Sequence, residues 1–160
     1  GGNAVSAEND PISLIRRTLR NSRTASLGTL DRGAAGPPGA PFVSLVQVAA
    51  RSDGAPTLLL STLAEHTQNA LGDPRASLLS DSTQGLPRPL TGPRVTLQGS
   101  LVETTDQLAR DRYLAKHLEA FEYVGFSDFA FYVLVPVSAH LVAGFGAIHW
   151  LPWADIAPLG

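Results

Sequence analysis

Apolar residues gather along the chain in short runs, and each run ends near Gly, Pro or Asp. Five of these runs have the length and the β-branched composition of strands: residues 24–30, 42–50, 56–61, 75–81 and 94–104. A sixth run covers residues 129–145 and contains Pro136, where we expect a break. Gly99 lies inside the fifth run, at a place where a bulge or bend is expected. Short turns join most of the runs, which predicts antiparallel pairing.

Two other segments repeat their apolar residues every three or four positions, as one face of a helix does. Residues 11–21 follow Asp10, a favourable N-cap, and begin with Pro11, which suits the first helical position. Residues 105–120 carry Leu108, Tyr113, Leu114 and Leu118 among charged residues, and predict a surface helix.

A third helix is expected directly after residue 61, in the stretch STLAEHTQN. Thr62 and Glu65 have the T-x-x-E spacing of a capping box, in which the two side chains satisfy free amides at a helix start. Leu63, Thr67, Ala70 and Leu71 then follow at helical spacing.

Six or seven short strands with two to four helices indicate an α+β protein built on an antiparallel barrel or a strongly bent sheet. Strands and helices do not alternate, which argues against a doubly wound nucleotide-binding fold. Residues 1–9 begin Gly1-Gly2, and we interpret them as a processed or disordered tail. Residues 10–160 are expected to form a single domain.

Composition limits the partners and the compartment. The formal net charge of -2 would repel nucleic acid slightly. There is no Cys for a disulfide or a thiolate metal site, and no apolar run approaches the roughly 20 residues of a membrane helix. We therefore expect no nucleic-acid partner, no membrane insertion and a cytoplasmic location.

Several catalytic and metal-binding patterns are missing from the sequence. There is no G-x-S-x-G elbow and no G-x-x-x-x-G-K-[ST] loop. His66, His117, His140 and His149 are far apart in sequence, with no H-x-x-x-H pair, so no metal site is expected. Whether the protein is an enzyme stays open; if it is one, a cofactor would bring the chemistry.

Four motifs follow one another in a specific order: STLAEHTQN (61–69), DPRASL (73–78), RYL (112–114) and GFG (144–146). This order resembles the FMN-binding split-barrel family of pyridoxamine 5'-phosphate oxidase-like proteins, and most of all its branch of split-barrel haem oxygenases. The similarity covers residues 10–151. It implies a six- to seven-stranded antiparallel split β-barrel, and a homodimer with the cofactor at the subunit interface. The cofactor implied is FMN, with haem as the alternative.

The resemblance also implies positions for the cofactor. The isoalloxazine would lie along residues 43–48, and its phosphate would sit at the turn after residue 61, where hydroxyls and a helix start favour an anion. The implied cofactor-binding residues are Ser44, Val46, Ser61, Thr62, His66, Thr67, Arg94, Gln98 and Phe145.

The sequence departs from the oxidases at two places. Their S-R-K run at this turn places its Arg and Lys on Glu65 and His66 of this chain. Glu65 cannot bind phosphate, whereas protonated His66 could, so anion affinity would rise at low pH. The oxidases' substrate arginine, in an R-x-H run, has no counterpart near GAIHW (146–150), which argues against pyridoxamine phosphate as substrate.

Three functions follow from these observations, in order of preference. The first is an FMN-dependent oxidoreductase that moves hydride or electrons between a reduced nicotinamide dinucleotide and an unidentified acceptor. The second is a haem-binding or haem-degrading protein, which needs an iron ligand from the four histidines. The third is a split-barrel dimer without a cofactor.

Overall fold

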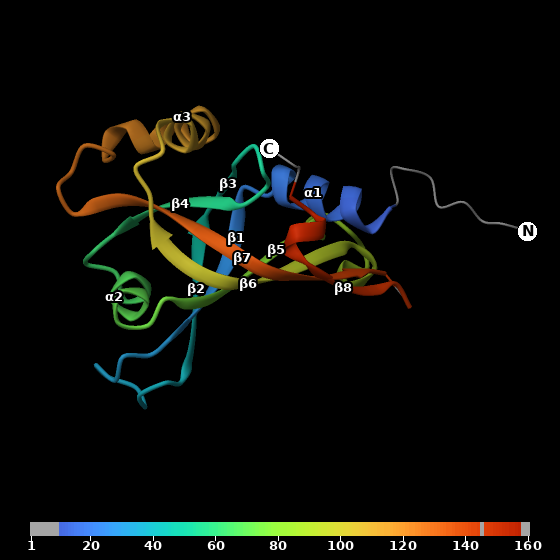
Figure 1. The fold of residues 1–160 in the computed structure, drawn as a ribbon, viewed down its shortest axis with the longest axis horizontal. Coiled ribbons are helices and arrows are strands. Elements are labelled where there is room, and N and C mark those ends of the chain that lie inside the picture. The colour runs from blue at the N-terminus through green and yellow to red at the C-terminus, as the bar shows by residue number, and fades with distance from the viewer. Residues whose placement is uncertain (1–9, 145, 158–160) are drawn as a thin grey trace, which may run out of the picture.

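The computed structural model describes residues 10–144 and 146–157. These residues form one curled antiparallel sheet with helices packed against it (Figure 1). The strands are β1 (Thr24–Leu30), β2 (Pro41–Gln47), β3 (Ala49–Ala50), β4 (Pro56–Ser61), β5 (Arg75–Asp81), β6 (Pro93–Glu103), β7 (Phe129–Ala143) and β8 (Ile148–Pro152). The α-helices are α1 (Pro11–Asn21), α2 (Glu65–Gly72) and α3 (Gln107–Lys116), and the 3-10 helices are η1 (Pro89–Thr91), η2 (Leu118–Glu122) and η3 (Trp153–Asp155).

The sheet confirms the α+β class and the antiparallel split barrel expected from the sequence. The strands expected at 24–30, 56–61 and 75–81 have the observed bounds. The run 42–50 is divided at Val48 into β2 and β3. Strand β8 is not expected from the sequence, and with the division of 42–50 the described residues contain eight strands where six or seven were indicated.

The strand order leaves the barrel open along one side. The order is β2-β1-β5-β6-β7-β4-β3, with β8 paired to β7. Strands β2 and β3 are consecutive in the chain, yet they lie at opposite ends of this order. The chain therefore crosses from one end of the sheet to the other at Val48. Strand β2 lies beside β4 there without a register of paired residues in the described part of the chain, and we call this gap the seam.

Gly99 marks a bulge, as expected, and this bulge explains why Pro136 does not break β7. The register between β6 and β7 shifts at Gln98/Gly99, and Gly99 then faces Pro136. A proline lacks the amide hydrogen that a regular ladder needs, and the irregular pairing accommodates it. The expected break is therefore wrong, and β7 continues through all 15 of its residues.

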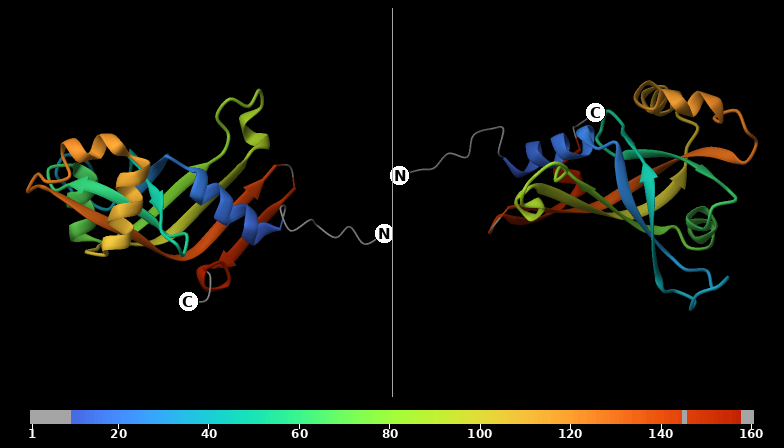
Figure 2. Two further views of the ribbon diagram at one scale, coloured as in Figure 1. Left: turned by 90° about the horizontal axis from the view of Figure 1, so that it is seen from above. Right: turned by 180° about the vertical axis from the view of Figure 1, so that it is seen from behind.

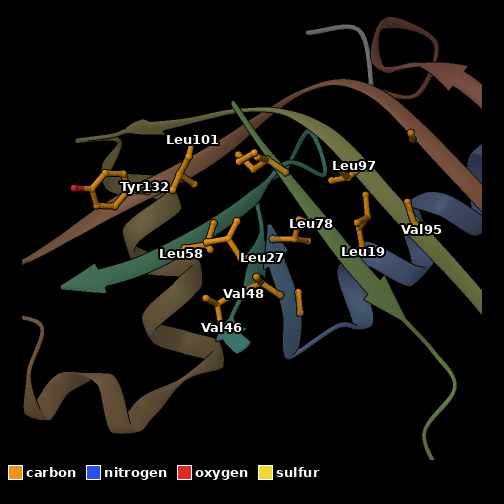
Figure 3. Close-up of a cluster of buried hydrophobic side chains, with 14 of the residues drawn as sticks. Leu19, Leu27, Val46, Val48, Leu58, Leu78, Val95, Leu97, Leu101 and Tyr132 are labelled. Atoms are coloured by element: carbon orange, nitrogen blue, oxygen red, sulfur yellow. The ribbon is translucent and has the colours of Figure 1, made fainter. Parts of the chain in front are cut away.

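The core lies inside the curl of the sheet, where every second residue of each strand points inward. Leu27, Leu58, Leu78 and Leu97 come from four strands and meet there fully buried (Figure 3). Helix α1 adds Leu19 to this cluster and packs against β5 and β6 (Figure 2). Asp10 caps α1 as expected, since its carboxylate accepts from the Ser13 amide.

Helices α2 and α3 lie beside the seam. Helix α2 packs against β1 and β2, and α3 packs against β3 and β4 (Figure 1). Within residues 10–144 and 146–157, no helix is long and apolar enough to cross a membrane.

The close packing of Gly99 against the Val135 carbonyl predicts that a larger residue at position 99 destabilises the fold. A β-carbon on Gly99 would lie 2.0 Å from the Val135 carbonyl oxygen, so Gly99→Ala must displace the backbone. We expect it to lower the free energy of unfolding by about 2 kcal/mol, within the range for overpacked sites. Gly28→Ala is the matched control, because a β-carbon there meets Ser77 at an ordinary 3.7 Å. Urea unfolding of both variants measures the difference, and equal stabilities would contradict the bulge geometry.

Candidate functional site

A cavity of about 340 Å³ lies in the seam, and we call it the seam pocket. Residues 45–47 of β2 line one side, and residues 59–61 of β4 line the other. Ala64 and His66, at the start of α2, close one end. The volume falls within the range of about 300–1,000 Å³ that is usual for small-molecule sites.

Aromatic side chains complete the lining of the seam pocket, and we call them its aromatic wall. Tyr113 comes from α3, Tyr123 follows η2, and Phe129 begins β7. The rings of Tyr123 and Phe129 pack with centroids 4.9 Å apart. Tyr113 is buried, and burial raises the pKa of its hydroxyl, so the ring stays neutral at physiological pH. The wall therefore suits a flat, apolar ligand surface.

His66 is the histidine of this pocket, and its environment keeps it neutral. Its Nδ1 lies 3.0 Å from the Ser44 Oγ, which engages that nitrogen and leaves Nε2 for another group. Burial lowers the pKa of His66 below its usual value of 6.5. Because a neutral imidazole carries no charge for an anion at pH 7, the geometry weakens the phosphate role expected from the sequence.

The turn between β4 and α2 contains no capping box, so the capping box expected from Thr62 and Glu65 is wrong. The N-cap residue of α2 is Ala64, and no side chain caps this helix. Instead the Ser61 Oγ donates to the Asp128 carboxylate at 2.7 Å, and the Thr62 amide donates to the Asp128 carbonyl. Asp128 reaches this turn from 67 positions along the chain, and its carbonyl takes the Thr62 amide that Glu65 would accept in a capping box.

The helical face expected for this stretch is also partly wrong. Leu63 and Leu71 are 83% and 59% exposed, whereas Thr67 and Ala70 are buried. The Thr67 hydroxyl has no hydrogen-bond partner among the described residues and is shielded from solvent. Thr67 does not line the seam pocket.

Four of the sequence-derived candidates come together: Val46, Ser61 and His66 line the seam pocket, and Ser44 contacts His66. Gln98 lies elsewhere, in a hollow on the outer face of the sheet. Arg94 donates to the carbonyls of Leu90 and Gly92, near the start of β6. Neither Gln98 nor Arg94 lines the seam pocket. Phe145 lies outside the described residues.

The outer hollow has a volume of about 710 Å³ and is larger than the seam pocket. Its lining includes Gly28, which has no side chain, and Ser77, which has a small one, and it also includes Gln98. Exposed apolar residues surround it, since Val43 and Val137 are 67% and 72% exposed. It contains no histidine, and its flat apolar rim is typical of a contact surface.

The other three histidines are engaged away from the seam pocket. His117 is fully buried, and its Nε2 lies 2.8 Å from the Val48 carbonyl oxygen. His140 stacks on Trp150 with ring centroids 4.3 Å apart, and His149 pairs with Leu141 across β7 and β8. The described part of the chain contains no cluster of three potential metal-ligating side chains.

Sequence reasoning missed Asp128 and the aromatic wall. Asp128, in the segment SDFAF, gives no local signal, because only the fold brings it to the β4–α2 turn. Tyr113 had been assigned to a helix face, which is correct, but its position at the pocket depends on how α3 packs on β3 and β4.

Known proteins with related sequences or folds include haem-associated ones. One is the non-canonical heme oxygenase HOZ of the Arabidopsis thaliana chloroplast, 39% identical over 137 residues, which are 84% of this chain and 40% of that protein. The chain thus spans less than half of that relative. A heme binding protein from Mycobacterium smegmatis superposes with a TM-score of 0.83 at 28% identity, over 91% of this chain and 59% of that one.

HutZ from Vibrio cholerae, described as a heme storage protein, superposes with a TM-score of 0.57 at 22% identity, over 76% of this chain and 87% of that one. At this identity the likeness shows the fold alone. The family model described as "CREG, beta-barrel" matches residues 7–156, nearly the whole chain. With the split-barrel fold described above, this match shows that the chain belongs to the CREG β-barrel family.

Proposed function

We propose that this chain is a haem-binding split-barrel protein and that its ligand site is the seam pocket. The observation that carries the proposal is His66, a neutral imidazole in a cavity with an aromatic wall, with Nδ1 engaged by Ser44. The haem-associated relatives at 39% and 28% identity support the same choice.

The residues of the seam pocket fit an iron porphyrin. Iron in haem is commonly ligated by an imidazole nitrogen, and the ligand nitrogen must be unprotonated. The Ser44 Oγ can accept the Nδ1 hydrogen, which fixes the tautomer that presents Nε2 as a ligand. Tyr123 and Phe129 supply apolar contact area. When bound, haem would supply the redox chemistry of iron, which no side chain of the pocket provides.

The same pocket fits FMN less well. The open edge of β2 could meet the polar edge of an isoalloxazine, and this favours a flavin-dependent oxidoreductase using a nicotinamide dinucleotide as the second candidate. The phosphate end does not fit, because the Asp128 and Glu65 carboxylates lie at the turn where it would bind. The flavin hypothesis, preferred on sequence alone, therefore becomes the second choice.

A third candidate, a split-barrel dimer without a cofactor, would require the cleft to be filled by side chains. The cavity in the seam argues against it, because both backbone and side-chain groups face open space there.

We further propose that the outer face of the sheet binds a second copy of the chain. Val43, Val137, Ile148 and Trp150 are each between 60% and 72% exposed on this protein. Apolar surface of this extent is rare on monomers and is normally covered by a partner. An isologous pair would bury these residues and would bring the Gln98 of one copy towards the ligand of the other.

The iron-ligand role of His66 is tested by haem titration. We expect His66→Ala to weaken haem binding at least about tenfold and to shift the Soret band, because losing even an outer-shell partner of a metal ligand typically costs that much. His149→Ala is the matched control, because His149 lies on β8, outside the pocket and on the opposite face from Trp150. Identical titrations for wild type, His66→Ala and His149→Ala would rule out the proposed ligand.

The protonation state of His66 is a separate test. Because burial lowers its pKa below the usual 6.5, the imidazole is still mostly neutral at pH 6.5 and its protonation midpoint lies below that value. Haem ligation should therefore be strongest at neutral and higher pH and should lose half of its strength only below pH 6.5. An NMR titration of the His66 ring in the ligand-free protein measures the midpoint directly, and a midpoint above 6.5 would refute this environment.

Dimer formation is tested on the outer face. We expect Val137→Glu to convert a wild-type dimer into a monomer, because it would place two charges in an apolar contact. Leu90→Glu is the control, since Leu90 is similarly exposed at 68% but lies in the η1 segment. Light scattering coupled to gel filtration gives both masses. A monomeric wild type, or a Val137→Glu protein that stays dimeric, would overturn this assignment.

A further inference from the structure

The β4–α2 turn has the ingredients of an anion site, but the backbone donors that lead into α2, at residues 62–64, are already in use. Helix starts favour anions because their amides point outward and the helix dipole is positive there. Here the Thr62 amide donates to the Asp128 carbonyl, and the Ala64 amide donates to the Ser61 carbonyl. The Leu63 amide donates to the Ser61 Oγ at 3.1 Å.

The Ser61 hydroxyl is also committed. It donates its single hydrogen to the Asp128 Oδ2 at 2.7 Å, the short distance of a charge-assisted bond. Asp128 is partly buried at this position, and the Ser61 it contacts lines the seam pocket. An ionised carboxylate only accepts hydrogen bonds, so an arriving phosphate would meet an acceptor where it needs a donor.

We propose that Asp128 is a specificity-determining residue. Its carboxylate lies at the β4–α2 turn, where the anionic group of a ligand would otherwise bind, so the seam pocket excludes ligands that present phosphate or carboxylate to this turn. The proposal rests on the proposed function only in taking the seam pocket as the ligand site.

A second carboxylate, that of Glu65, also disfavours an anionic ligand at this turn. Glu65 begins α2, and its side chain is 54% exposed. The Arg32 guanidinium lies 3.4 Å from the Glu65 Oε1 and offsets that charge only in part, since both groups are well solvated. Asp128 is less exposed than Glu65 and is hydrogen-bonded to the pocket residue Ser61, so solvent screens its charge less.

The seam pocket should therefore bind a ligand with a neutral end at this turn more tightly than the same ligand with an anionic end. Riboflavin and FMN share the isoalloxazine and differ by the terminal phosphate, so they form a matched pair of probes. Wild type should bind riboflavin more tightly than FMN. Replacing the Asp128 carboxylate by an amide removes the charge, keeps an acceptor for Ser61 and adds a donor for phosphate.

The experiment measures riboflavin and FMN affinity by flavin fluorescence quenching for wild type, Asp128→Asn and Asp128→Ala. Glu122→Gln is the control, since it removes one carboxylate from η2, outside the contacts of Ser61. Circular dichroism melting confirms that each variant is folded, and the wild-type comparison of the two flavins needs no variant. Haem titration of the same proteins is a separate readout, so loss of the haem proposal would not decide this one.

We expect the FMN affinity of Asp128→Asn to exceed that of wild type by about tenfold, with riboflavin affinity and the Glu122→Gln protein unchanged. Asp128→Ala frees the Ser61 hydroxyl and should gain in the same direction. A gain of threefold or more, including FMN binding that becomes measurable only in the variants, supports the proposal. A smaller gain in both variants, or a wild type that binds FMN as tightly as riboflavin, overturns it.

Discussion

The seam depends on a single crossing point at Val48. Its amide donates to the Arg23 carbonyl at the end of the β1–β2 pairing, and its carbonyl oxygen lies 2.8 Å from the Nε2 of buried His117. The next residues then pair with β4 instead of β1. Because a buried carbonyl without a partner is costly, the contact with His117 allows the chain to leave one end of the sheet and join the other. The barrel is closed by chain connectivity there, while β2 and β4 stay apart.

The seam then determines which chemistry the site can offer. The open edges of two strands, an aromatic wall and a half-buried histidine create a low-dielectric cleft, and this environment favours neutral forms. The pKa values of both His66 and Tyr113 shift in that direction. Asp128 keeps its carboxylate at the edge of the cleft because Ser61 donates to it. A flat ligand whose charged groups avoid this turn is therefore the best match.

Local patterns were sufficient to predict most of the fold but less of the site. The bulge could be predicted from Gly99 alone. Only glycine fits there, because a β-carbon would lie 2.0 Å from the Val135 carbonyl oxygen. Strand β7 was wrongly divided because Pro136 suits the bulge that lies opposite, in a strand more than 30 positions earlier. The capping box at Thr62 is absent for a similar reason, since the carbonyl of Asp128, in a distant segment, accepts the Thr62 amide that Glu65 would accept in a capping box. His66 was found because histidine is informative in any sequence, whereas Tyr123 and Phe129 resemble ordinary core residues until α3 and η2 are placed.

The central claim is that the ligand lies in the seam, and hydrogen exchange measured with and without haem tests it most directly. We expect haem to slow amide exchange at residues 45–47 and 59–61 and at the start of α2, because these segments line the seam pocket. Protection centred on residues 75–77 and 98–100 of the outer hollow, with the seam unchanged, would contradict the account.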